Sequence, residues 1–151
     1  MDELEFELAR DLALALDVAD AADAFTLPRF ETADFTLGWK DDRSEVTEAD
    51  RGAESALAER VLAERPDHGF VGEEHGVQGR AESPWRWIVD PIDGTSGFVR
   101  GIPVWATLIA LTHDEAGVEV LVTGSGELRL GADPVDLERM RRAQCGDQHA
   151  V

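Results

Sequence analysis

Residues 87–95 read Trp-Ile-Val-Asp-Pro-Ile-Asp-Gly-Thr, and this stretch decides the expected fold. Its apolar, β-branched start predicts a short buried strand that breaks at Pro91 into a loop. The loop carries two carboxylates, Asp90 and Asp93, and Thr95 is suited to cap a short helix behind it. Carboxylate and carbonyl oxygens suit Mg²⁺, and free N–H groups at a helix start attract an anion. The stretch therefore predicts a site for a hard cation and phosphate, although an ordinary Asp-Pro turn followed by a cap has the same residues.

Two further acidic motifs precede this stretch. Residues 46–50 are Val-Thr-Glu-Ala-Asp, and residues 72–76 are Gly-Glu-Glu-His-Gly, directly after a short apolar run. In this order, the three motifs closely resemble those of the inositol monophosphatase family, whose members are Mg²⁺-dependent, Li⁺-sensitive phosphomonoesterases. Residues 98–107, Phe-Val-Arg-Gly-Ile-Pro-Val-Trp-Ala-Thr, are most similar to the histidinol-phosphatase branch. The resemblance runs from about Leu12 to about Thr112.

The resemblance implies a set of metal ligands. Glu73, Asp90 and the carbonyl of Ile92 would hold a first Mg²⁺. Asp90 and Asp93 would share a second ion, and Asp50 would lie beside the outermost metal. Two or three Mg²⁺ ions are implied, with Mn²⁺ as a substitute and Li⁺ as an inhibitor. Such ions neutralise phosphate oxygens, activate a bound water and stabilise the leaving alkoxide.

The same resemblance implies the catalytic and substrate-binding residues. Glu74 and Thr95 would orient and deprotonate the attacking water, and the N–H groups at the helix start would receive the phosphate. The implied substrate-binding set is Glu73, Ile92, Asp93, Gly94 and Thr95. The implied reaction is hydrolysis of a phosphomonoester, with histidinol phosphate of histidine biosynthesis as the substrate and inositol 1-phosphate as the alternative.

Three nearby residues also have simpler interpretations. Asp50 follows Thr47 by three positions, which is close to a capping box, so it would stabilise the start of a helix whether or not it serves a metal. Lys40 matches a lysine near the metals of the family, yet a lone lysine in a polar turn is more typical of a protein surface. His75 has no partner recognisable in the sequence, so we expect a loop histidine.

The resemblance implies an α+β fold, the N-terminal half of a layered αβαβα sugar-phosphatase-type architecture with two long helices on a largely antiparallel sheet. The apolar spacing predicts both helices. The first should run from about Asp2 to Phe25 and stop before Pro28, and the second from Thr47 to about Glu64. Strands or extended segments are expected at residues 30–39, 69–72, 103–112 and 118–122, a polar connection at 78–84, and a short helix at 133–142.

Composition limits the class of protein. A chain of 151 residues suits one domain, and 43% apolar residues are normal for a globular protein. The net charge of −18 disfavours nucleic acid and anionic membranes as partners. Cys145 is the single cysteine and cannot form an intramolecular disulfide. The acidic N-terminus, and the lack of a run of about 20 apolar residues, favour a cytoplasmic enzyme acting on a small phosphomonoester; a homodimer is compatible with the sequence.

We expect an inositol-monophosphatase-like domain over residues 1–112 and a divergent segment over residues 113–151. The family has a second half with a further metal-binding aspartate in a Trp-Asp-x-Ala-type motif, and no such motif follows Thr112. A truncation, a frameshift or a deliberately short relative would each explain this. Two functions stay open: a phosphatase of the histidinol-phosphatase type, and a catalytically incompetent metal-binding fragment that acts only through interaction. We expect the isolated chain to hydrolyse histidinol phosphate weakly or undetectably, no better than inositol 1-phosphate.

Overall fold

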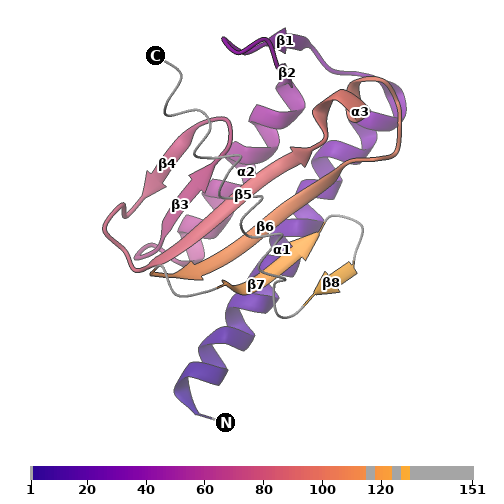
Figure 1. Ribbon diagram of the computed structural model, residues 1–151. Coiled ribbons are helices and arrows are strands. Elements are labelled where there is room, and N and C mark those ends of the chain that lie inside the picture. The colour runs from indigo at the N-terminus through magenta and orange to yellow at the C-terminus, as the bar shows by residue number, and fades with distance from the viewer. Residues whose placement is uncertain (1, 115–117, 124–126, 130–151) are drawn as a thin grey trace.

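A computed structural model describes residues 2–114, 118–123 and 127–129. Two long helices, α1 (Glu3–Thr32) and α2 (Glu48–Glu64), lie against one face of a six-stranded sheet (Figure 1). In spatial order its strands are β4 (Gly76–Gly79), β3 (Gly69–Gly72), β5 (Trp85–Asp93), β6 (Ala106–His113), β7 (Val118–Thr123) and β8 (Glu127–Arg129). β3 runs parallel to β5, and the other neighbours are antiparallel. The predicted α+β arrangement is confirmed.

The core lies between the two helices and the sheet. Alternate residues of β5 and β6 face the helices, as expected from the period of two along a strand. Leu14 and Val18 of α1 and Leu57 of α2 pack there against Trp87 of β5, which is fully buried. In the described part of the chain, no helix is long and apolar enough to cross a bilayer.

α1 is longer than predicted. It begins at an N-cap, Asp2, and continues through Pro28 to Thr32, so the predicted end near Phe25 is wrong. The extended segment expected at residues 30–39 is correspondingly shorter. It forms β1 (Leu37–Trp39), which pairs with β2 (Glu45–Thr47) in a separate antiparallel hairpin.

Contacts beyond the proline explain why the helix continues. Proline removes a backbone hydrogen bond and normally bends or ends a helix. Arg29 Nη1 donates to the carbonyl of Phe25 at 2.8 Å, an additional hydrogen bond next to the proline. Two residues beyond the proline, the ring of Phe30 packs on Phe98 and Trp105, each at a centroid distance of 5.5 Å. This tertiary packing outweighs the local cost of the proline.

The start and end of α2 match the prediction. Thr47 is its N-cap and forms a capping box with Asp50, and the helix ends at Glu64. Ala53, Leu57 and Val61 lie on its buried face, as their spacing indicates.

β5 continues past the point where it was predicted to break. Its pairing with β6 extends to Asp93, opposite Ala106, through an irregularity between Asp90 and Asp93. Pro91 lies within this irregularity, where a strand tolerates the loss of a backbone donor. The strand therefore carries both aspartates into the site, and the predicted loop at Pro91 is wrong.

Three other boundaries differ from the prediction. Gly94, not Thr95, is the N-cap of the short helix α3 (Thr95–Val99), so the predicted role of Thr95 as the cap is wrong. β4 occupies residues 76–79, so the first residues of the expected polar connection pair with β3 instead. β6 begins three residues later than expected, at Ala106. Strands β3 and β7 are confirmed, and the helix expected at residues 133–142 lies outside the described residues.

Candidate metal and phosphate site

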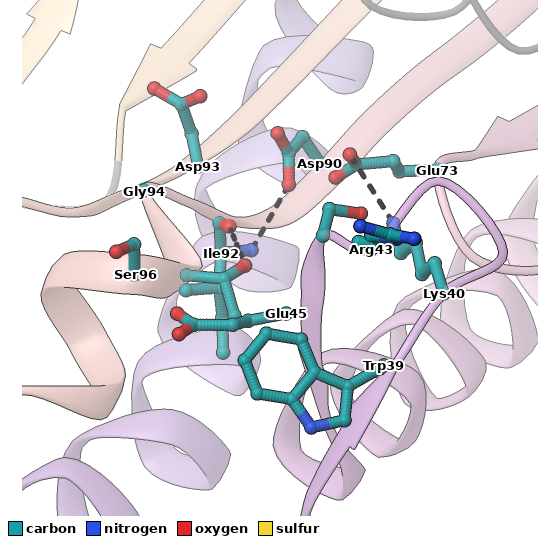
Figure 2. Close-up of a pocket in the computed structure, with 12 residues that line it drawn as sticks. Trp39, Lys40, Arg43, Glu45, Glu73, Asp90, Ile92, Asp93, Gly94 and Ser96 are labelled. Atoms are coloured by element: carbon teal, nitrogen blue, oxygen red, sulfur yellow. Dashed lines mark hydrogen bonds and ion pairs between the residues drawn. The ribbon is translucent and has the colours of Figure 1, made fainter.

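The acidic motifs meet at one edge of the sheet. Glu73 and Glu74 directly follow β3, and Asp90 lies near the end of β5, which is parallel to β3. Because parallel strands end at the same edge, the N–H of Glu73 reaches the carbonyl of Val89 at 3.2 Å. A pocket of about 440 Å³ opens there (Figure 2). It is lined by Trp39, Lys40, Arg43, Ser44, Glu45, Glu73, Asp90, Ile92, Asp93, Gly94, Thr95 and Ser96.

Glu73 and Asp90 form the centre of the site. Their carboxylates turn toward each other in Figure 2. Burial raises the pKa of Asp90 to about 9, and the charge of Glu73 adds to the shift. Asp90 therefore carries a proton at neutral pH unless a cation replaces it. Two carboxylates that face each other are chemically suited to a hard cation.

The third predicted carboxylate is not grouped with this pair. In Figure 2 the side chain of Asp93 lies apart from those of Glu73 and Asp90. Among the described residues, no three Asp, Glu, His or Cys side chains are clustered closely enough to be ligands of one metal ion. The donor set has the right chemistry, with two carboxylates and the nearby Ile92 carbonyl, but Asp93 would have to turn to join it.

Lys40 is part of the site and not a surface residue, so that interpretation is corrected. Its Nζ lies 2.9 Å from Glu74 Oε1 and 3.5 Å from Glu73 Oε1, and its side chain is only 21% exposed. Burial lowers the pKa of Lys40, but the contacts with the two glutamates outweigh it and raise the pKa overall. Burial raises the pKa of Glu74, against the opposing effect of Lys40. The lysine charge thus partly neutralises the predicted pair of adjacent glutamates.

Asp50 caps the second helix and also contacts Thr95 of the candidate site. It is fully buried, and its Oδ2 accepts from the backbone N–H of Thr47 at 2.7 Å and from Thr47 Oγ1 at 2.5 Å, which completes the helix cap. Its Oδ1 accepts from Thr95 Oγ1 at 2.9 Å. The cap of α2 therefore holds the hydroxyl that the resemblance makes catalytic, and helix capping by Asp50 is confirmed. A role beside a metal ion stays a prediction.

Gly94 allows the chain to turn from β5 into α3. Its φ of +92° lies in the left-handed region, and an added Cβ would come within 2.8 Å of the Val104 carbonyl oxygen. Both conformation and space therefore require glycine. The turn is held by packing beneath it, where Ile92 and Phe98 form a second buried cluster with Ala49. This places Gly94 and Thr95 in the wall of the pocket.

The sequence did not reveal Glu54. This fully buried residue of α2 accepts from the backbone N–H groups of Glu74 at 2.6 Å and His75 at 2.7 Å. Its Oε1 also lies 3.1 Å from His75 Nδ1, a partner that the sequence does not show. His75 lies between β3 and β4, so the predicted loop histidine is confirmed. The available signal was a glutamate on the otherwise apolar face of α2, next to Ala53 and Leu57.

The fold and site define the class of protein. Residues 7–122 match the sequence model of the inositol monophosphatase family, and the chain belongs to that family. The extragenic suppressor protein suhB from Bartonella henselae has the same fold, with a TM-score of 0.67 and 29% identity. That comparison covers 76% of this chain and 44% of the suhB chain.

Three relatives have sequences similar to part of this chain. The chain is 49% identical over 107 residues to the histidinol-phosphatase of Streptomyces coelicolor, covering 71% of this chain and 40% of the relative. It is 50% identical over 108 residues to the histidinol-phosphatase of Mycobacterium tuberculosis, covering 69% and 40%. It is 44% identical over 78 residues to the inositol-1-monophosphatase of Caulobacter vibrioides, covering 52% and 30%. The chain therefore spans about 40% of the length of the histidinol-phosphatases that it matches.

Proposed function

We propose that this protein is a Mg²⁺-dependent phosphomonoesterase whose substrate is histidinol phosphate. The observation that carries the proposal is the Glu73–Asp90 pair, in which two carboxylates face each other at the edge of a pocket. Family membership supports the reaction, and the two histidinol-phosphatases support the substrate. The inositol-1-monophosphatase relative, matched over a shorter stretch, supports inositol 1-phosphate as the alternative.

The proposed metal ligands come from the two strand ends. Glu73, Asp90 and the Ile92 carbonyl would hold one Mg²⁺, and Asp90 and Asp93 would share a second. Bound Mg²⁺ would neutralise phosphate oxygens, lower the pKa of water and stabilise the leaving oxygen. Mn²⁺, another hard cation that oxygen ligands accept, should substitute, and Li⁺ should compete.

The remaining residues would bind the substrate, orient the attacking water and accept its proton. The N–H groups of Gly94 and Thr95, two residues in the wall of the pocket, would receive the phosphate. The Thr95 hydroxyl, held by Asp50, would orient the attacking water. Glu74 would accept a proton from that water, since burial already raises the pKa of its carboxyl and thereby makes it a stronger base.

Isothermal titration calorimetry with Mg²⁺ and Mn²⁺ tests the metal site directly. The wild type should bind both ions, whereas Asp90→Asn should lose binding because an amide cannot replace the anionic ligand. Asp11→Asn is the matched control, because Asp11 is a buried acid of α1 paired with Arg65 away from the pocket. Equal binding by the wild type and Asp90→Asn would contradict the proposal.

Phosphate release in millimolar Mg²⁺ tests the reaction and the substrate. Release from histidinol phosphate should require the metal and should be absent in Asp90→Asn. Faster release from inositol 1-phosphate than from histidinol phosphate would favour the alternative substrate. Metal binding without any release would favour the catalytically incompetent, metal-binding alternative.

A further inference from the structure

Glu54 is a fully buried acid that the proposed chemistry does not use. Its side chain extends from α2 to the backbone of the turn that carries Glu73 and Glu74. Its two carboxylate oxygens accept from the N–H of Glu74 at 2.6 Å and the N–H of His75 at 2.7 Å. Charge-assisted hydrogen bonds of this length are among the stronger ones in proteins. The carboxylate therefore fixes two consecutive backbone groups of the turn.

Gly72 provides the space for this contact. An added Cβ at Gly72 would lie 2.0 Å from Glu54 Oε1 and 2.1 Å from its carboxyl carbon. No positive φ is involved at this position, so glycine is required here by the carboxylate and not by the backbone conformation. Gly72 at the end of β3 therefore leaves open the space that the Glu54 carboxylate of α2 occupies.

The turn is held from two sides. The N–H of Glu73 donates to the Val89 carbonyl on β5, and Glu54 holds the next two N–H groups from the helix layer. Between these anchors, the Glu73 side chain meets Asp90. Loss of the hydrogen bonds from Glu54 would let the turn move relative to β5. This movement would separate the carboxylates of Glu73 and Asp90.

We propose that Glu54 is a positioning residue that holds the Glu73–Glu74 turn against the end of β5 and so sets the affinity of the site for a divalent cation. This inference rests on the proposed function, because it assumes that Glu73 is a metal ligand. Residues that orient metal ligands without touching the ion commonly change metal affinity by about 10- to 100-fold when they are replaced.

The first test compares Glu54→Gln with Asp11→Asn, two isosteric changes at buried acids. The glutamine amide has one acceptor oxygen, so one of the two backbone N–H groups loses its partner. Calorimetry with Mg²⁺ and Mn²⁺ should give a Kd at least about tenfold higher for Glu54→Gln. Asp11→Asn should leave the Kd unchanged, even if both variants lower the melting temperature. A Kd for Glu54→Gln equal to that of a metal-binding wild type would overturn the inference.

A second readout needs no metal. Amide hydrogen exchange at Glu74 and His75 should be faster in Glu54→Gln than in the wild type and in Asp11→Asn. If the wild type binds neither ion, the proposed function fails, and unchanged exchange in Glu54→Gln would separately overturn the anchoring. Changed exchange with unchanged metal affinity would reduce Glu54 to a purely structural role and would also overturn the inference.

Gly72→Ala approaches the same contact from the other side and covers the case in which Glu54→Gln does not fold. Its new methyl group would displace the Glu54 carboxylate, so the Kd for Mn²⁺ should rise as in Glu54→Gln. In a Glu54→Ala background, which removes the clashing carboxylate, Gly72→Ala should add no further change. Additive effects of the two substitutions would show that they act independently and would contradict the inference.

Discussion

At the scale of single residues, Asp50 shows how one carboxylate can serve both the fold and the site. One oxygen completes the cap of α2 through Thr47, and the other accepts from the Thr95 hydroxyl. A buried acid that caps a helix therefore also fixes the direction of a side chain 45 positions away in the sequence. The sequence alone shows the first role, because the cap is local.

Asp50→Ala should lower the free energy of unfolding by about 1 kcal/mol for the cap and about 1 kcal/mol for the hydrogen bond to Thr95. The primary metal site at Glu73 and Asp90 should remain. Urea denaturation measures the first effect, and Mg²⁺ calorimetry measures the second. A complete loss of Mg²⁺ binding in this variant would show that Asp50 is itself needed to hold the ion.

At the scale of elements, a hydrogen bond joins the residue before β3 to a side chain in the middle of β5. Trp87 Nε1 of β5 donates to Nδ1 of His68, which directly precedes β3, at 3.0 Å. His68 also stacks on Trp85 at a centroid distance of 5.8 Å. This bond requires an unprotonated Nδ1, so the contact between the two parallel strands depends on the charge of one imidazole.

The contribution of His68 to the free energy of unfolding should therefore fall on acidification. Burial lowers the pKa of His68, Arg65 lowers it further, and Asp11 opposes the shift. Since the pKa is lower in the folded chain, the unfolded chain binds more protons near and below the ordinary value of about 6.5, and stability falls as pH falls.

Urea denaturation between about pH 7.5 and about pH 5.5, on either side of that value, measures the effect. Acidification should destabilise the wild type relative to His68→Gln, whose amide oxygen can still accept from Trp87 but does not titrate. The same pH dependence in both proteins would assign it to other groups.

At the scale of the whole molecule, the acidic residues near the pocket support one metal site more strongly than they support two. The carboxylates of Glu73 and Asp90 face each other, whereas Asp93 lies apart, and no third acid joins Asp90 and Asp93 in the described part of the chain. A weakly held second ion contributes little to stabilising the leaving oxygen.

Turnover of histidinol phosphate by this chain should accordingly be slow. A deficit of roughly 4 kcal/mol in transition-state stabilisation corresponds to about a thousandfold in rate. Phosphate release with millimolar Mg²⁺ measures it, with Asp93→Asn as the control for the second ion. Turnover near 1 s⁻¹, which is ordinary for enzymes, would show that the chain assembles a complete site by itself.

The features predicted correctly are those that local patterns determine. The Thr47–Asp50 cap needs only residues within one turn. The meeting of Glu73 and Asp90 is implied only by the family resemblance, because it depends on the parallel pairing of β3 with β5, which no local pattern shows. The helix beyond Pro28 depends instead on Phe30 reaching rings far along the chain. Glu54 differs from other helical glutamates in the sequence only by its place on the largely apolar face of α2, and its role depends on a turn 20 positions away. Lys40 likewise shows its role only when its turn folds back over the glutamates.

The position of Lys40 has a consequence for how cation affinity is measured. Its ammonium group is tethered beside Glu73 and Glu74, so these carboxylates meet it at a constant effective concentration, of the order of millimolar or more for a short tether. A dissolved metal ion that binds Glu73 must displace this built-in competitor. The measured affinity is therefore that of an exchange between two cations, one of which can never be diluted or dialysed away.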